Sequence, residues 1–486
     1  MTNRAGLGYQ DFLFVAFFIG VLASGSQMLS IDSDLGRHLT LGNYILDHGV
    51  IPTRDIFSHT LANEARPPYE WLSQVIFALA NRLLGLDGVI LLTAIIINTA
   101  ILITSESANR RSKSPLLAFL ITALAGAATS IHWLPRPHIV TFLFLAIWVD
   151  QLEQLRKGRR FRFYIFPVIM LFWANMHGGF IFGILTWIAY FAGWVWEKWR
   201  GTSGIVPGRY WLITGTSSLV ATIITPDLWH NWEAVLNNRS AYILSHTVET
   251  MRPNFSDPSV IPFILLVGLV VVAFLTSRQT LSASHVFLLT GLGILSIVMQ
   301  RNIPLFAIAS APILADSFSR KLDQTSLWSG IENRFSLPAH QVRGFFFPLV
   351  IVSLVAGFLA LNQTDKKPTF AFNPNVFPVQ AVDWIESNPI EGNMFNEFNW
   401  GGYLLYRLWP QHLVFVDSQS DFYGEPLMRE YEAMMIAQDN WRELFQIYEI
   451  SWVIIPTQAP LAKPLSIETD WKTVYQDTVA VIFVRR

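Results

Sequence analysis

The chain has 486 residues, of which 52% are hydrophobic and only 14% are charged. Soluble proteins carry about 25% charged residues, so much of this chain is expected to face lipid rather than water. A net charge of -1, without a stripe of basic and aromatic residues, argues against nucleic-acid binding. The lack of cysteine excludes disulfides, thiolate nucleophiles and Cys-ligated metals.

Apolar runs separated by short polar clusters occupy most of the first three quarters of the chain. A helix needs about 20 apolar residues to cross a bilayer, and the first run lacks the cleavage site of a removed signal peptide. We expect a mainly α, polytopic membrane helix bundle of eleven spans, at 12–30, 87–105, 115–131, 138–152, 163–176, 179–196, 210–225, 260–276, 284–299, 303–316 and 344–361.

The basic residues give the orientation of this bundle. Lys and Arg collect in alternate connections, as in 156–162, and such connections stay in the cytoplasm, which places the amino terminus inside. The stretch 70–84 carries Gln74, Asn81 and Arg82 among its apolar positions and predicts an amphipathic helix at the outer interface. The short loops suit a bacterial inner membrane.

Two regions follow from this topology. Residues 1–362 form the predicted transmembrane domain, with a first outer loop at 31–70, and residues 363–486 form a predicted extracytoplasmic α/β domain. In the second region, short apolar runs alternate with helical stretches. The expected strands are 412–416, 452–455 and 479–484, and the expected helices are 379–387 and 426–448.

Unusual polar clusters fall almost entirely in the predicted outer connections. A single charge or His near a span is often solvated or satisfies a nearby backbone group. Ionisable groups this close to hydrocarbon are nevertheless costly and tend to line a cavity or a substrate path. Their recurrence on one face predicts a functional outer cavity, built from the first loop and from 132–138, 173–179, 227–231 and 300–302.

Asp32 and Asp34 stand where the first span ends. Two carboxylates at this spacing can bind a divalent cation such as Mg²⁺ or Mn²⁺ through oxygen ligands. Alternatively, one carboxylate can act as a general base while the other holds the acceptor. Both interpretations stay open, and the sequence establishes no cofactor.

Several basic and amide side chains are candidates for binding substrate. Arg136 stands between two prolines, and its guanidinium suits bidentate contact with a phosphate. His138 and His177 can donate hydrogen bonds to a phosphate leaving group. The full candidate set is Arg37, His38, Arg136, His138, Asn175, His177 and Arg301. In the outer domain, Glu397, Asp417, Asp421 and Tyr423 can face the cavity, although Asp417 and Asp421 more readily close turns.

The arrangement resembles the GT-C class of integral membrane glycosyltransferases, in a poorly characterised bacterial branch. The resemblance is carried by the acidic pair of the first outer loop, the interfacial helix, the outer carboxy-terminal domain and a set of short motifs. These motifs are Asp32-Ser-Asp34, Gly49–Ser58, Glu70-Trp71-Leu72, Trp400-Gly401-Gly402-Tyr403 and Asp417–Tyr423. The chain lacks the WWD-type motif of the oligosaccharyltransferases, which disfavours a protein acceptor.

The resemblance implies transfer of a sugar from a polyprenyl-phosphate donor to a lipid or glycan acceptor on the outer face, with membrane lipid as the other partner. It places Asp34, or Asp32, in the position of the catalytic carboxylate. Two other classes stay open: a transporter or flippase of lipid-linked saccharides, and a non-catalytic scaffold. A transporter predicts polar groups on both faces and inverted repeats, and neither is apparent.

Overall fold

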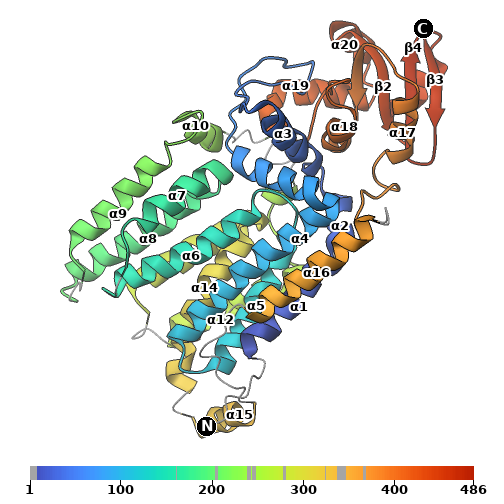
Figure 1. Ribbon diagram of the computed structural model, residues 1–486. Helices are drawn as coiled ribbons and strands as arrows, with labels where there is room; N and C mark the ends of the chain where they lie inside the picture. The colour runs from blue at the N-terminus through green and yellow to red at the C-terminus, as the bar shows by residue number, and fades with distance from the viewer. Residues whose placement is uncertain are drawn as a thin grey trace.

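The computed structural model describes residues 8–159, 161–202, 206–237, 242, 248–276, 281–322, 325–335, 346–364 and 368–486. Most of the chain is helical (Figure 1). The bundle contains α1 (Tyr9–Ala23), α2 (Gly25–Ile31), α3 (Leu35–His48), α4 (Trp71–Arg111), α5 (Pro115–Thr129), α6 (Ile139–Arg156), α7 (Ile165–Met176), α8 (Phe180–Trp199), α9 (Gly208–Ala221), α10 (His230–Asn237), α12 (Ile261–Thr276), α13 (Ala283–Val298), α14 (Ile303–Leu322), α15 (Ser326–Arg334) and α16 (Phe346–Thr364).

The prediction of eleven membrane spans is wrong. Within the described ranges, four helices are long and apolar enough to cross a membrane, or five when α1 and α2, which meet at 47°, count as one broken span. Other predicted spans form shorter helices, such as α7 with 12 residues and α13 with 16. A rise of about 1.5 Å per residue leaves such helices shorter than a bilayer core of about 30 Å.

The longest helix, α4, contains a break that separates two predicted elements. Leu84 and Gly85 have non-helical backbone angles, and Gly85 has a φ of 57°, which glycine adopts without steric cost. The break coincides with the end of the predicted amphipathic helix at 70–84. Glu70 and the start of α4 are thereby turned away from the long apolar part of the same helix.

The carboxy-terminal region is a small α/β structure at the end of the molecule opposite α15 (Figure 1). Its sheet has the order β1-β2-β4-β3, with β1 parallel to β2 and the other neighbours antiparallel. The strands are β1 (Asn393–Asn396), β2 (Ile450–Pro456), β3 (Trp471–Gln476) and β4 (Ala480–Arg485). The helices are α17 (Val379–Ser387), α18 (Gly401–Leu408), α19 (Ser420–Met435), α20 (Trp441–Ile447) and α21 (Ala462–Ile467).

Three of the five predicted elements of this region are confirmed, and two are wrong. Helix 379–387 has the predicted bounds, β2 contains the predicted strand 452–455, and β4 overlaps the predicted strand 479–484 at all but its first residue. The single helix predicted at 426–448 is instead two helices, because α19 ends at Met435, Ala437 has a left-handed φ of 55°, and α20 begins at Trp441. Residues 412–416 form no strand of the sheet, because Val414 makes a single parallel bridge with Ser58 of the first loop. The apolar run therefore joins this region to the first loop.

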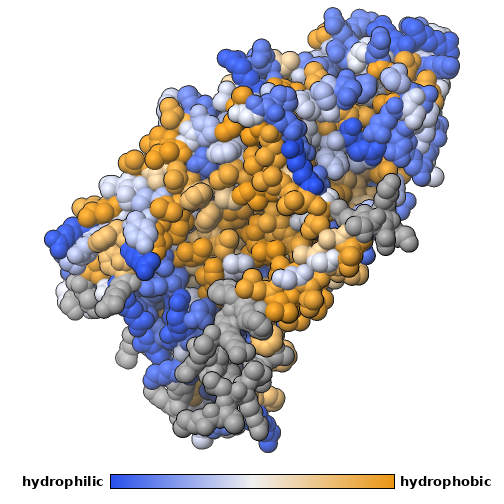
Figure 2. All heavy atoms as spheres, viewed as in Figure 1, coloured by the Kyte–Doolittle hydropathy of each residue, from blue (hydrophilic) through white to orange (hydrophobic). Residues whose placement is uncertain are grey.

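Apolar side chains cover the middle of the helix bundle in the view of Figure 2, and polar side chains gather towards its ends and over the carboxy-terminal region. Close packing fixes that region against the bundle. A Cβ on Gly36 of α3 would lie 2.1 Å from the carbonyl oxygen of Gly402, and a Cβ on Gly402 would lie 2.2 Å from the carbonyl oxygen of Ser33. The backbones of α3 and α18 thus meet beside the turn that carries Asp32 and Asp34.

Candidate active site

Asp32 and Asp34 lie in the tight turn between α2 and α3. The Asp32 side chain is 1% exposed, and its Oδ1 accepts hydrogen bonds from the backbone N–H of Asp34 at 2.8 Å and of Leu35 at 3.0 Å. These bonds satisfy amides at the start of α3, which have no partner within the helix. The turn therefore fixes Oδ1 of Asp32 by hydrogen bonds, whereas Oδ2 has no such partner and can act on a substrate.

Arg136 joins three carboxylates from two segments. Its Nε donates to Asp32 Oδ1 at 2.8 Å, while its Nη1 lies 2.7 Å from Asp34 Oδ2 and donates to Glu249 Oε1 at 2.7 Å. Arg136 comes from the irregular segment before α6, and Glu249 lies in the short helical turn Val248–Thr250. A buried guanidinium with its charge spread over a planar fork suits such a shared ion pair.

The two aspartates differ in pKa. Burial raises the pKa of Asp32 to about 6, despite the nearby guanidinium of Arg136. Burial also opposes ionisation of Asp34, but Arg136 and Arg37 outweigh it and hold the pKa of that carboxyl below its usual value. Asp34 is thus an anion throughout, whereas Asp32 takes up a proton near pH 6, and its buried Oδ2 has no hydrogen-bond partner.

Three histidines lie beside this cluster. The rings of His132 and His138 have centroids 4.1 Å apart, and those of His138 and His177 lie 6.4 Å apart. The Nδ1 of His177 accepts from the backbone N–H of Gly179 at 3.0 Å, so its proton resides on Nε2. Burial lowers the pKa of His177 to about 3 and that of His138 well below its usual value, so both rings are neutral. The Nε2–H of His138 donates to the carbonyl of His132 at 2.9 Å, and His177 keeps its Nε2–H for the site.

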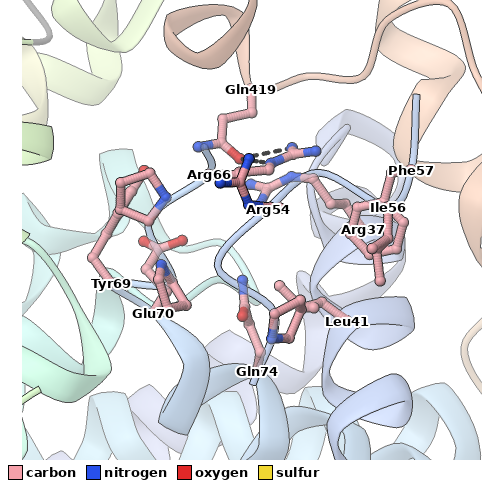
Figure 3. A pocket seen from close by; sticks show the side chains of 13 residues that line it. Arg37, Leu41, Arg54, Ile56, Phe57, Arg66, Tyr69, Glu70, Gln74 and Gln419 are labelled. Carbon is pink, nitrogen blue, oxygen red and sulfur yellow. Dashed lines mark hydrogen bonds between the residues drawn. The ribbon is translucent and has the colours of Figure 1, made fainter. Parts of the chain in front are cut away.

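Glu70 connects these histidines to α3. Its two oxygens lie 3.7 Å from His177 Nε2 and 3.9 Å from His38 Nδ1. Burial raises the pKa of Glu70 to about 8, so at neutral pH this side chain is mostly a carboxylic acid. Glu70, Gln74 and Arg37 together line a small pocket (Figure 3), and Arg37 also lies 3.5 Å from Asp34.

The carboxy-terminal region completes the site. The hydroxyl of Ser418 donates a hydrogen bond to Asp34 Oδ1. Asp417 is fully buried, and its Oδ1 lies 3.8 Å from the Nε of Arg37. Arg37 in turn lies 3.5 Å from Asp34, so it stands between two carboxylates from regions far apart in the sequence.

Arg66 ties the first loop to the same carboxylate. It lies 2.5 Å from Asp55 and 2.9 Å from Asp417, and it donates to Gln419 Oε1 at 2.8 Å (Figure 3). Its guanidinium also lies over the ring of Phe422, 4.4 Å from the centroid. The loop and the carboxy-terminal region are therefore held together by buried charges rather than by apolar contact alone.

The structure brings together most of the predicted substrate-binding residues, namely Arg37, His38, Arg136, His138 and His177. Arg301 is exposed. Its positive charge adds to the effect of burial, and both lower the pKa of His177. Asn175 is committed elsewhere, since its Oδ1 accepts from Trp71 at 2.8 Å and its amide nitrogen donates to two backbone carbonyls.

Sequence reasoning missed Glu249 and assigned no role at the site to Glu70 or Ser418. Glu249 is an acidic residue in a predicted outer connection, which was a usable signal. Glu70 and Ser418 lie within the Glu70-Trp71-Leu72 and Asp417–Tyr423 motifs. Their partners are distant in sequence, so spacing alone could not reveal the contacts.

The carboxylates do not fit a divalent cation. Mg²⁺ and Mn²⁺ take about six oxygen ligands in octahedral geometry. Each of Asp32, Asp34 and Glu249 instead gives an oxygen to Arg136, and only Asp32 Oδ2 is buried without a partner. Among the residues that the structure describes, no group of three His, Asp or Glu side chains has the geometry of a metal site.

The sequence matches no protein-family model, and a comparison with curated proteins gives no match. The fold, in contrast, resembles solved structures. The oligosaccharyltransferase of Archaeoglobus fulgidus in the apo form superposes with a TM-score of 0.59 at 12% identity, over 91% of this chain and 70% of its own. ArnT from Cupriavidus metallidurans superposes with a TM-score of 0.52 at 13% identity, over 96% of this chain and 97% of its own.

Both neighbours are GT-C glycosyltransferases, so the resemblance seen in the sequence is confirmed at the level of the fold. The archaeal enzyme AglB is also known in complex with an inhibitory peptide and a dolichol-phosphate, and that complex has a TM-score of 0.59 and 12% identity over 93% of this chain and 70% of its own. ArnT is also known bound to undecaprenyl phosphate, with a TM-score of 0.50 and 13% identity over 96% of this chain and 97% of its own.

Proposed function

We propose that this chain is a membrane glycosyltransferase that moves a sugar from a polyprenyl-phosphate donor to a lipid or glycan acceptor at the outer face of the membrane. One observation carries the proposal. A buried aspartate with an unpartnered oxygen lies beside a guanidinium and neutral histidines, in a fold shared with glycosyltransferases that bind lipid phosphates.

In this proposal Asp32 is the general base. Its Oδ2 takes the proton of the acceptor hydroxyl, and the hydroxyl oxygen then bonds to the anomeric carbon. The bond from that carbon to the donor phosphate oxygen breaks, and its electron pair leaves with the phosphate. A single displacement of this kind inverts the anomeric centre. Asp34, fully paired with Arg136, keeps the arginine and the turn in place.

The leaving phosphate gains negative charge, and the proposal directs it towards the histidine side of the site. Neutral His177 offers an N–H donor there, and Arg301 adds positive charge from the surface, whereas the N–H of His138 donates to the carbonyl of His132 and orders the ring beside it. Preorganised donors of this kind stabilise charge that develops in a transition state.

An apolar groove suggests where the lipid of the donor lies. A cavity of about 440 Å³ is lined by Asn175 and by apolar side chains that include Val220, Ile224 and Leu228. Val220 and Ile224 are 60% and 58% exposed, which suits contact with hydrocarbon. Asn175 stands two residues before His177 in the chain, and for this reason we assign the lipid of the donor to this groove.

A second cleft, also of about 440 Å³, is suited to the acceptor. Ile31 and Ser33 line it from the bundle, and Glu397, Asn399 and Trp400 line it from the carboxy-terminal region. Ser33 separates Asp32 from Asp34, so the cleft reaches the catalytic turn. Its polar and aromatic lining resembles surfaces that bind saccharides through hydrogen bonds and ring contacts.

The test is transfer of radiolabelled sugar from a panel of polyprenyl-phosphate sugars by the purified chain. We expect transfer by the wild type and a loss of about 10² to 10⁴-fold in Asp32→Asn, the range for removal of a general base. Asp47→Asn, an exposed aspartate paired with Arg82, is the matched control and should retain activity. A wild type that binds undecaprenyl phosphate but transfers nothing from the panel would favour a flippase or a scaffold.

A further inference from the structure

Arg136 lies at the centre of a cluster of carboxylates in the candidate active site. Three carboxylates, those of Asp32, Asp34 and Glu249, each place one oxygen 2.7 to 2.8 Å from its guanidinium. They come from the α2–α3 turn and from a segment more than two hundred residues later. Convergence of three anions on one centre is the arrangement that a bound divalent cation normally requires.

Arg136 is held at this centre by its own chain. It stands between Pro135 and Pro137, whose rings restrict the local backbone, and its N–H donates to the carbonyl of Leu134 at 2.8 Å. Its side chain is only 14% exposed. The guanidinium is thus held within the cluster and is not a surface group in solvent.

The remaining oxygens offer little to a metal ion. Asp34 Oδ1 accepts from Ser418, and Glu249 Oε2 lies 3.8 Å from His132 Nε2. Asp32 Oδ2 alone is buried and unpartnered. A dication bound through that oxygen would also lie close to the positive charge of Arg136, and the two cations would repel each other.

We infer that Arg136 takes the place of a divalent cation in this chain, so that the site works without Mg²⁺ or Mn²⁺, and that removing Arg136 uncovers a metal site formed by Asp32, Asp34 and Glu249. The inference rests on the same residues as the proposed function. Its test, however, measures metal binding and does not require glycosyl transfer.

The experiment is Mn²⁺ binding to the purified full-length chain, followed by electron paramagnetic resonance after treatment with EDTA. We expect Arg136→Ala to bind about one Mn²⁺ per chain and the wild type to bind it at least about tenfold more weakly. Arg136→Ala combined with Glu249→Gln should lose the gained affinity. Arg82→Ala, which frees the single carboxylate of Asp47, is the matched control and should gain none.

Thermal unfolding of each variant, with and without Mn²⁺, reports whether it is folded. If Arg136→Ala does not fold, Arg136→Gln takes its place in the binding measurement. The inference is overturned if a folded Arg136 variant binds no Mn²⁺. It is also overturned if the wild type binds one Mn²⁺ that Asp32→Asn removes. Should neither variant fold, the wild-type measurement decides. Lack of transfer activity, with this binding pattern intact, would reject only the proposed function.

Discussion

At the scale of single residues, Asp32 and Asp34 share a turn but differ in pKa. Arg136 contacts both, yet only Asp34 also receives a hydrogen bond from Ser418 and the charge of Arg37. Asp32 is more deeply buried, which raises its pKa towards neutrality. The sequence left their roles open, and the surrounding groups favour Asp32 as the base.

This difference predicts a pH dependence. Asp32 accepts a proton only when ionised, and burial raises its pKa to about 6. We therefore expect kcat/KM for sugar transfer to rise about tenfold per pH unit below about pH 6 and to level off above it. The measurement is the pH profile of the wild type, with Asp47→Asn as a control that keeps the same profile. A profile that stays flat between about pH 5 and 7 would contradict the assignment of Asp32.

At the scale of elements, the contact between α3 and α18 decides how the carboxy-terminal region reaches the site. The Trp400-Gly401-Gly402-Tyr403 motif was recognised in the sequence as part of a family resemblance, without a physical role. The structure supplies that role, since Gly402 meets the backbone at Ser33 and Gly36 meets the backbone at Gly402.

Substitution of Gly402 by alanine tests this contact. Its Cβ would lie 2.2 Å from the carbonyl oxygen of Ser33, and a backbone atom cannot move aside as a flexible side chain can. We expect Gly402→Ala to lower the free energy of unfolding by about 1 to 3 kcal/mol and to impair transfer, because Ser33 lies between the two aspartates. Thermal unfolding and the transfer assay measure the two effects.

The matched control is Gly357→Ala in α16, where a Cβ would meet nothing within 4 Å. Alanine favours the helix over glycine by up to about 1 kcal/mol, so this variant should be as stable as the wild type or slightly more stable. Equal behaviour of the two variants would show that the α3–α18 contact does not position the site.

At the scale of the whole molecule, the apolar bundle separates two polar ends. The candidate active site and the carboxy-terminal region lie at one end, and α15 lies at the other (Figure 1). The basic residues of the sequence predict that the active-site end faces outward. The orientation of the chain in the membrane remains a prediction.

The absence of cysteine makes this orientation directly measurable. Single cysteines introduced as Arg429→Cys in α19 and Ser329→Cys in α15 replace exposed side chains at opposite ends of the molecule. We expect a membrane-impermeant maleimide to label Arg429→Cys in intact cells, and Ser329→Cys only after the membrane is opened. The reverse pattern would place the proposed site in the cytoplasm and would exclude an acceptor at the outer face.

Local patterns determined much of this protein from the sequence alone. Apolar runs gave the helical bundle, and the small strands β2 and β4 followed from short apolar segments bounded by turn residues. The amphipathic composition of 70–84 anticipated the break at Gly85. These features depend on neighbouring residues, which is why they could be read without the fold. The number of spans was overestimated because an apolar run does not reveal how long its helix becomes.

The candidate site was determined only in part by sequence. Asp32, Asp34 and Arg136 were identified by residue type and predicted location. The tertiary structure alone placed Glu249 and Ser418 against them, filled the centre of the three carboxylates with a guanidinium, and distinguished the two aspartates by burial. Such features depend on contacts between segments hundreds of residues apart and on the exclusion of water at their junction. Neither is encoded in the local order of residues, so packing decides the charge and the chemistry of the site.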